Sequence, residues 1–316
     1  MLIYLLKRPY GSDIISSVKK KGDDGMYRQK LALNLSATFE LDMKEQISLI
    51  KKTGFEEIFI DATDGKTDVP PLVKKAAEES IGIQSLHAPF DKSAVMWNES
   101  GEEAGRALEE LLYYIELCAE YEIPVAVTHA FIGFYTGRKP TTAGVERYGA
   151  AAKRASELGV KLALENTEGD EFLDTLFREL RSEKSVGFCW DSGHEQCYNH
   201  GRDLLALYGD RLWGTHLNDN LGISDYNGRL TFWDDLHLMP FDGIIDWNDV
   251  AARLAKCGFD GTLTFELKRI GRTERTDSRK YEKMPPDEYI AEAYSRACRV
   301  AALKLRADAS RNKNDA

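Results

Sequence analysis

Short apolar runs alternate with longer amphipathic stretches along the chain from residue 30 onward. The short runs are nearly continuous in Ile, Val, Leu and Phe, which is typical of strands buried on both faces of a parallel sheet. They predict eight strands, at residues 31–36, 57–62, 83–89, 125–130, 161–166, 186–192, 212–218 and 261–267. Apolar positions between these runs recur with the period of an amphipathic helix. They predict helices at residues 43–53, 70–80, 102–121, 141–158, 171–180, 202–207, 246–256 and 287–305.

Eight strand–helix units predict an α/β protein, a single (β/α)₈ TIM barrel over residues 30–306, because about 250 residues is typical of that fold. An open doubly wound sheet is the competing architecture, and it would be expected to carry a glycine-rich phosphate turn after its first strand. Asn34, Leu35, Ser36 and Ala37 occupy that position instead. The sequence also contains no GxGxxG, P-loop or GxSxG motif, so the barrel is the better interpretation.

Two terminal segments lie outside this pattern. Residues 1–29 have no clear period and contain a lysine run followed by glycines and aspartates. We therefore expect a poorly ordered extension there, with Met26 as a candidate natural start. We expect residues 307–316 to form a disordered tail.

The composition narrows the classes of function. The chain has 42 Lys and Arg against 52 Asp and Glu, a net charge of −10, and an acidic protein repels nucleic-acid phosphates at long range. No apolar run approaches the length of a membrane span, and no secretory signal is recognisable. We therefore expect a cytoplasmic protein with neither a nucleic-acid nor a membrane partner. The five cysteines are widely spaced without a CxxC pair, which disfavours disulfides and thiolate zinc sites.

The polar side chains that end six consecutive strands are the strongest functional signal. They are His87, His129, Glu165, Asp191, His216 and Glu266. A single histidine at a strand end more often serves a structural hydrogen bond, but a carboxylate directly after an apolar run needs a cation or several hydrogen bonds. All strands of a TIM barrel end at one mouth, where its catalytic groups lie. The convergence therefore predicts a metal-binding or catalytic site, with Cys189 one layer deeper on the same face as Asp191.

Carboxylate oxygens combined with imidazole nitrogens suit a divalent metal ion. Mn²⁺ is our first expectation, Co²⁺, Zn²⁺ and Fe²⁺ are also suited, and Mg²⁺ is less suited because of the histidine. Asp235 and His237 lie in the long loop after the seventh strand, and their spacing can direct both side chains toward one site.

Several of these segments resemble the xylose isomerase-like TIM barrel superfamily, and within it the sugar phosphate isomerase/epimerase group. The resemblance runs from about residue 30 to about residue 302 and is specific for the superfamily rather than for one substrate. The matching segments are residues 85–89 (SLHAP), 162–166 (LALEN), 190–194 (WDSGH), 216–220 (HLNDN), 235–237 (DLH) with Pro240, and 243–247 (GIIDW).

The resemblance implies a metal-dependent isomerase or epimerase that acts on a small sugar or sugar phosphate through an enediolate. The metal ligands it implies are Glu165, Asp191, His216 and Glu266. The two glutamates would also transfer the proton as general base and general acid, and the metal would stabilise the enediolate oxygen as charge develops. We assign substrate binding to His87, His129, His194, Asp235, His237 and Lys268.

Two departures from the group's pattern leave the substrate open. Asn218 stands where many sugar epimerases have histidine, and Phe241 follows Pro240 where glycine is usual. Both positions are expected near the substrate.

Two alternative functions share this barrel. A trinuclear-zinc apurinic-site endonuclease like endonuclease IV uses nine ligands, and the chain has nine candidates: His87, His129, Glu165, Asp191, His194, His216, Asp235, His237 and Glu266. The acidic net charge and the segment 245–247 disfavour the nuclease, which would need several Lys or Arg residues around the mouth. An inosose-type dehydratase also abstracts a proton next to a carbonyl, and the sequence does not separate it from an epimerase. The oligomeric state is also undecided by the sequence, and a homo-oligomer is possible.

Overall fold

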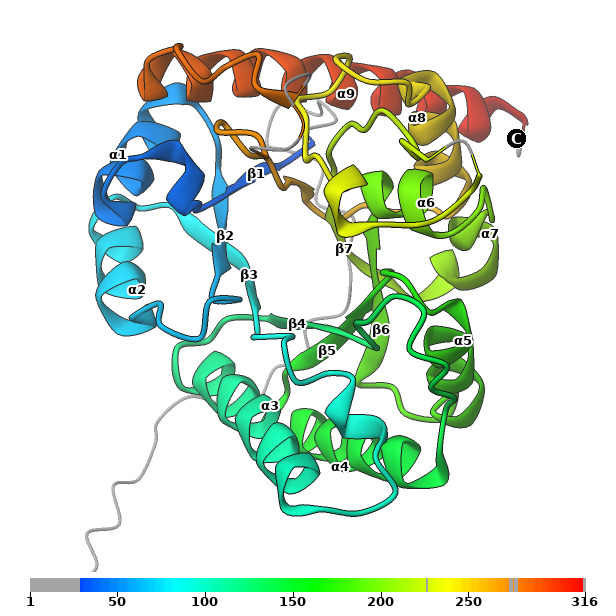
Figure 1. Cartoon of the computed structure of the whole chain (residues 1–316). Coiled ribbons are helices and arrows are strands. Elements are labelled where there is room, and N and C mark those ends of the chain that lie inside the picture. The colour runs from blue at the N-terminus through cyan, green and yellow to red at the C-terminus, as the bar shows by residue number, and fades with distance from the viewer. Residues whose placement is uncertain (1–28, 226, 273–274, 276–277, 315–316) are drawn as a thin grey trace, which may run out of the picture.

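The structure is a computed structural model that describes residues 29–225, 227–272, 275 and 278–314. Nearly all of the expected N-terminal extension, residues 1–28, lies outside the described residues. Within the described part, eight parallel strands form a nearly closed barrel with helices around it (Figure 1). This confirms the predicted (β/α)₈ fold.

The strands are neighbours in chain order around the barrel. They are β1 (Leu31–Asn34), β2 (Glu57–Asp61), β3 (Gly82–His87), β4 (Val125–His129), β5 (Lys161–Glu165), β6 (Val186–Asp191), β7 (Leu212–His216) and β8 (Leu263–Phe265). The ladder runs β7-β6-β5-β4-β3-β2-β1-β8, and every ladder is parallel. Because all strands point the same way, their carboxyl ends meet at one mouth.

The seam between β7 and β8 closes the ring just beyond the regular ladders. Leu217 forms a parallel bridge with Phe265, and its amide donates to the Thr264 carbonyl at 2.8 Å. The Glu266 amide donates to the Leu217 carbonyl at 3.2 Å. The Thr264 amide donates to the hydroxyl of Thr215 at 3.0 Å, so a side chain supplies an acceptor at this seam.

Nine helices in the described part of the chain surround the strands. They are α1 (Met43–Thr53), α2 (Val69–Glu78), α3 (Glu102–Glu120), α4 (Thr142–Leu158), α5 (Asp170–Glu179), α6 (Ser192–Tyr198), α7 (Leu204–Tyr208), α8 (Trp247–Lys256) and α9 (Pro286–Asn314). Short 3₁₀ turns lie at η1 (Ala37–Phe39), η2 (Val95–Trp97), η3 (Gly209–Arg211) and η4 (Phe232–Asp234). The long helix α9 packs on α8 and α1 (Figure 1). Among the described residues, none of these helices has the length and apolar character that crossing a membrane requires.

Two helices differ from the sequence-based expectation. α6 was not predicted, because Asp191 ends a strand and also caps this helix by accepting a hydrogen bond from the His194 amide at 2.6 Å. α9 continues to Asn314 across most of the segment expected to be a tail. Lys304 is buried in it and pairs with Asp308 one turn later at 2.8 Å, which supports the helix beyond residue 305.

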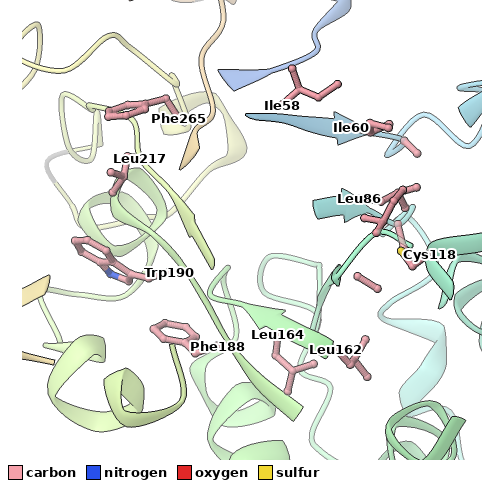
Figure 2. Close-up of a cluster of buried hydrophobic side chains, with 14 of the residues drawn as sticks. Ile58, Ile60, Leu86, Cys118, Leu162, Leu164, Phe188, Trp190, Leu217 and Phe265 are labelled. Carbon is pink, nitrogen blue, oxygen red and sulfur yellow. The ribbon is translucent and has the colours of Figure 1, made fainter. Parts of the chain in front are cut away.

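Apolar side chains fill the space between the strands and the surrounding helices. Figure 2 shows part of this layer, including Ile58, Ile60, Leu86, Leu162, Leu164, Phe188, Trp190 and Phe265. A smaller cluster consists of Val125, Val127, Ala163 and Cys189. Side chains two positions apart on a strand share a face, so His129, Glu165 and Asp191 follow this cluster toward the mouth. Cys189 therefore lies one layer below Asp191, as predicted.

Candidate metal centre

Strand register brings the candidate residues together at the carboxyl end of the barrel. His129 is paired with Glu165 between β4 and β5, and Asp191 is paired with His216 between β6 and β7. Glu266 follows β8 directly, so it reaches the same layer across the seam. The prediction that these strand ends converge is thus met by the geometry of the barrel.

Four side chains form the central group. Ligand-capable atoms of Glu165, Asp191, His216 and Glu266 all lie within 4.8 Å of one another. The Nδ1 atom of His216 is 3.0 Å from Glu165 Oε1 and 3.0 Å from Glu266 Oε2. Two atoms bound to one metal at about 2.1 Å are roughly 3–3.4 Å apart. The spacing of these donors therefore fits a shared cation, and a cation would offset the cost of burying three carboxylates close together.

Asp191 is held in position by hydrogen bonds to both of its oxygens. Oδ1 accepts from the His194 amide at 2.6 Å, and Oδ2 accepts from Asn218 Nδ2 at 2.8 Å. Asn218 is the residue that replaces the histidine of many sugar epimerases, and here its amide orients a candidate ligand. A Cβ atom on Gly193 would lie 1.9 Å from Asn218 Oδ1, so this contact requires glycine.

Two further histidines approach Glu165 from the side of β3 and β4. His87 Nε2 lies 2.8 Å from Glu165 Oε2, and His129 Nε2 lies 3.5 Å from the same oxygen. Both rings are buried. The Nδ1 atom of His129 has no hydrogen-bond partner among the described residues. Glu165 is therefore the residue that connects the central group with this pair.

A separate group of three lies on the side of the β7–α8 loop. It consists of His194, Asp235 and His237, whose ligand-capable atoms lie within 4.8 Å of one another. His194 Nε2 is 3.4 Å from Asp235 Oδ1, and His237 Nε2 is 2.9 Å from Asp235 Oδ2. His237 has a backbone φ of 48°, in the left-handed region that few non-glycine residues adopt.

Three of these histidines are oriented in the same way. His87 Nδ1 lies 2.7 Å from the Ala88 carbonyl, His194 Nδ1 lies 2.9 Å from the Asn166 carbonyl, and His237 Nδ1 lies 3.2 Å from the Glu266 carbonyl. A carbonyl can only accept, so each Nδ1 carries the proton and each Nε2 faces a carboxylate. The lone pair of each Nε2 and those of the carboxylate oxygen repel each other unless a proton or a cation lies between them. Metal-binding histidines have this same orientation, with one ring nitrogen donating to a carbonyl and the other facing the metal.

The candidate residues surround a cavity of about 400 Å³. Its walls include eight of the predicted residues: His87, His129, Glu165, His194, Asp235, His237, Glu266 and Lys268. Asp191 and His216 are fully buried and do not line it. Phe90, Phe134, Tyr198 and Phe232 add aromatic surface. A cavity of this volume and lining is suited to a small polar molecule.

Comparison with known proteins places this geometry in a family. A family model described as the xylose isomerase-like TIM barrel matches residues 47–295. The chain belongs to this family. Uncharacterized protein y4fM of Sinorhizobium fredii is 31% identical over 303 residues, which cover 82% of this chain and 93% of that protein. Probable endonuclease 4 of Methanocorpusculum labreanum is 26% identical over 180 residues, which cover 49% of this chain and 63% of that protein.

Solved structures, among them a sugar epimerase, share the fold. D-Psicose 3-epimerase of Clostridium cellulolyticum H10, solved with D-tagatose, has a TM-score of 0.66 at 17% identity and covers 86% of this chain and 99% of its own. The IolI protein with a bound zinc atom has a TM-score of 0.68 at 21% identity and covers 86% of this chain and 97% of its own. At these identities the likeness shows the common fold.

In this xylose isomerase-like barrel, burial and neighbouring charges together shift the pKa values of the central group. Burial raises the pKa of Asp191 to about 6, and Glu165 and Glu266 add to the increase. Burial would raise the pKa of Glu165 too, but His216 and other histidines hold it well below its usual range. Burial would lower the pKa of His216, but Cys189 and the two glutamates hold it well above its usual range. The acidic side chains around His216 thus favour a positive charge at the centre of this group.

Sequence reasoning missed Glu168, which also lines the cavity. Its side chain is buried, and Oε1 accepts a hydrogen bond from the Gly133 amide at 2.5 Å. No Lys, Arg or His of the described chain forms an ion pair with it. Burial raises its pKa. Its place three residues after Glu165, in the polar segment that follows β5, is the only signal that could have revealed it.

Asp219, which sequence reasoning also missed, ties the end of β7 to the loop before α8. It is fully buried and accepts hydrogen bonds from the Phe241 amide and the Trp247 indole, both at 2.9 Å, and from the Ile245 amide at 3.1 Å. Phe241 has a φ of 72°, which explains why glycine is usual at that position. Its ring packs near Trp247 and under Arg299, at 5.7 and 3.9 Å.

Proposed function

We propose that this protein is a divalent-metal-dependent isomerase or epimerase of a small sugar or sugar phosphate. The observation that carries the proposal is the central group, in which Glu165, Asp191, His216 and Glu266 bring donor atoms within 4.8 Å of one another at the barrel mouth. These four residues would hold the metal. When bound, the ion acts as a Lewis acid that polarises a carbonyl and an adjacent hydroxyl of the substrate.

The two glutamates are suited to moving the proton. Both line the cavity, so both can reach a bound substrate. Surrounding histidines hold the pKa of Glu165 well below its usual range and that of Glu266 at about 2, although burial alone would raise both. One ionised carboxylate accepts the proton from the carbon next to a carbonyl. The second glutamate takes up a proton from solvent and then returns it to the opposite face or to the adjacent carbon.

Substrate binding falls to the other cavity residues. His87, His129, His194, Asp235, His237 and Lys268 keep the role assigned from the sequence as part of this proposal. The cavity volume suits a monosaccharide, and the neighbours named as D-psicose 3-epimerase and L-ribulose 3-epimerase act on sugars of this size, at 17% and 14% identity. These likenesses support the class of substrate but not one sugar.

Proton exchange with solvent tests this proposal. We expect protein supplied with Mn²⁺ to exchange one carbon-bound hydrogen of a ketose for deuterium in D₂O, read by mass spectrometry across a panel of ketoses and their phosphates. Glu165→Gln should abolish exchange while the circular dichroism spectrum stays unchanged. The exposed Glu146→Gln is the matched control and should exchange at the wild-type rate. Exchange that persists in Glu165→Gln would contradict the assigned role.

A trinuclear nuclease is the second candidate, because one further observation favours it. The group His194, Asp235 and His237 could bind a metal of its own, and His87 and His129 meet Glu165 as a third group. The 26% identity with probable endonuclease 4 points the same way.

The number of bound metal ions separates the two candidates. We expect about one ion per chain for the isomerase, measured by inductively coupled plasma mass spectrometry after dialysis, and about three zinc ions for the nuclease. His237→Asn should leave the count at one in the first case and lower it by one in the second. Cleavage of an oligonucleotide with a single abasic site, together with three ions, would replace the isomerase proposal.

A further inference from the structure

Two cationic side chains lie together on one side of the cavity. Lys268 and Arg272, from the segment after β8, both line it, next to Asp235 and the exposed ring of Phe232. The Lys268 amide donates to the His237 carbonyl at 3.1 Å, so the main chain fixes where this side chain begins. The two side chains are 29% and 24% exposed. Both charges are therefore partly withdrawn from water and open to the cavity.

Arg272 is held in place on two sides. Its Nε donates to the Asp235 carbonyl at 2.9 Å, and Nη2 donates to Asp235 Oδ2 at 3.2 Å. Its guanidinium lies 5.5 Å from the ring centre of Phe232 and 6.0 Å from that of Trp233. These contacts use two of the five N–H groups of an arginine and order the guanidinium without a ligand.

Asp235 carries a single carboxylate but contacts two cationic side chains, Lys268 and Arg272. The Lys268 ammonium lies 3.6 Å from Asp235 Oδ2, and among the described residues this ion pair is its nearest contact with an acid. The same oxygen accepts from Arg272 and contacts His237 at 2.9 Å. Lys268 and Arg272 therefore share one carboxylate, and among the described residues neither has an ion-pair partner of its own.

Building on the proposed function, we propose that Lys268 and Arg272 form a subsite for an anionic group of the substrate, a phosphate monoester or a carboxylate. A guanidinium binds such groups through parallel N–H donors, and an ammonium adds a mobile point charge. Glu165 lines the same cavity of about 400 Å³. A single small molecule therefore presents its anionic group to this subsite and its reacting carbon to the glutamate.

Calorimetric titration with three matched ligands tests the subsite. D-Fructose, D-fructose 6-phosphate and D-gluconate are titrated into the purified wild-type protein and into Lys268→Met, Arg272→Gln and Lys74→Met. We expect at least one anionic ligand to bind the wild type ten or more times more tightly than D-fructose. This advantage should fall below threefold in the two cavity variants and persist in Lys74→Met, which removes an exposed lysine of α2. Lys268→Arg keeps the charge and should keep most of the advantage.

The outcomes separate the sources of the anion. A preference for the phosphate or for the gluconate identifies the group, and either supports the subsite. Equal affinity for all three ligands, or an advantage that survives in both cavity variants, would overturn it. Tighter binding of a duplex with an abasic site, weakened by the same substitutions while the sugar anions show no preference, would overturn it in favour of a nucleic-acid phosphate.

The subsite and the proposed function fail in different ways. If the protein prefers anionic ligands but shows no deuterium exchange, the subsite is supported and the isomerase proposal is contradicted. If a neutral ketose alone exchanges deuterium and anionic ligands are not preferred, the isomerase proposal is supported and the subsite is contradicted.

Discussion

At the scale of single residues, Glu168 links the cavity to the pH dependence of stability. Burial raises the pKa of this carboxyl above its ordinary value of 4.5. The folded protein therefore holds the proton at a pH where the unfolded chain has released it. The contribution of Glu168 to stability is therefore present at low pH. It is lost as the pH rises through the pKa of Glu168 in the unfolded chain and then through its pKa in the folded protein.

Glu168→Gln removes this titration and keeps an acceptor for the Gly133 amide. We expect the variant to gain stability relative to the wild type as the pH rises from 5 to 8, measured by urea unfolding in the presence of a chelator. The exposed Glu146→Gln is the matched control, because it makes the same chemical change at the surface. A Glu168→Gln curve parallel to that of the wild type would mean that Glu168 is ionised in the folded protein.

A site residue can be predicted from the sequence when the fold fixes the direction in which its side chain points. Glu165 and Glu266 end strands, and parallel strands of a barrel all end at one mouth, so their meeting could be predicted from eight apolar runs. Glu168 and Arg272 lie in loops, where no period fixes the direction of a side chain. Their place on the cavity wall depends on contacts with Gly133 and Asp235, which are distant in the chain.

At the scale of elements, Asp219 sets the path of the chain from β7 to α8. Its carboxylate accepts from the amides of Asn220, Phe241 and Ile245 and from the Trp247 indole, at 2.8–3.1 Å. Asp219→Asn would turn an NH₂ group toward buried donors. We expect it to lower the free energy of unfolding by about 3 kcal/mol, because losing a buried charged acceptor costs roughly that much.

Urea unfolding followed by tryptophan fluorescence measures this loss. The exposed Asp260→Asn makes the same chemical change outside the loop and should shift the free energy by less than about 0.5 kcal/mol. A loss in Asp219→Asn no larger than in this control would show that the loop keeps its path without the carboxylate.

The helix α6 escaped prediction because one residue serves two elements. Asp191 ends β6 and caps α6, so the strand runs into the helix without a loop. Periodicity alone could not show this, because the apolar run gives no sign of where the helix begins. The cap itself is a recognisable signal, since aspartate is among the preferred N-cap residues.

At the scale of the whole molecule, the number of strand–helix units was sufficient to predict the barrel, because eight parallel strands close on themselves in this fold. The hydrogen bonds that close the ring between β7 and β8 could not be predicted from the sequence. The β7–β8 seam relies on one bridge and on the Thr215 hydroxyl, and a threonine in a strand gives no sign that its side chain will replace a carbonyl acceptor.

The Thr215 hydroxyl should therefore contribute to the stability of the entire ring. Thr215→Val keeps the shape of the side chain and leaves the buried Thr264 amide without its acceptor. We expect a loss of about 1–3 kcal/mol in urea unfolding, the usual cost of an unsatisfied buried donor. Unfolding should stay a single transition, because the two strands belong to one hydrophobic core. Amide hydrogen exchange should quicken first at Leu217 and Glu266, whose hydrogen bonds complete the seam.

Thr215→Ser is the matched control, since it keeps the hydroxyl and removes only the methyl group. It should retain slow exchange at both seam amides and lose less stability than the valine variant. If valine and serine variants behaved alike, the methyl group rather than the hydroxyl would be holding β7 against β8. The barrel would then be closed by packing, and the hydrogen bond from Thr264 would be a consequence of closure rather than a cause of it.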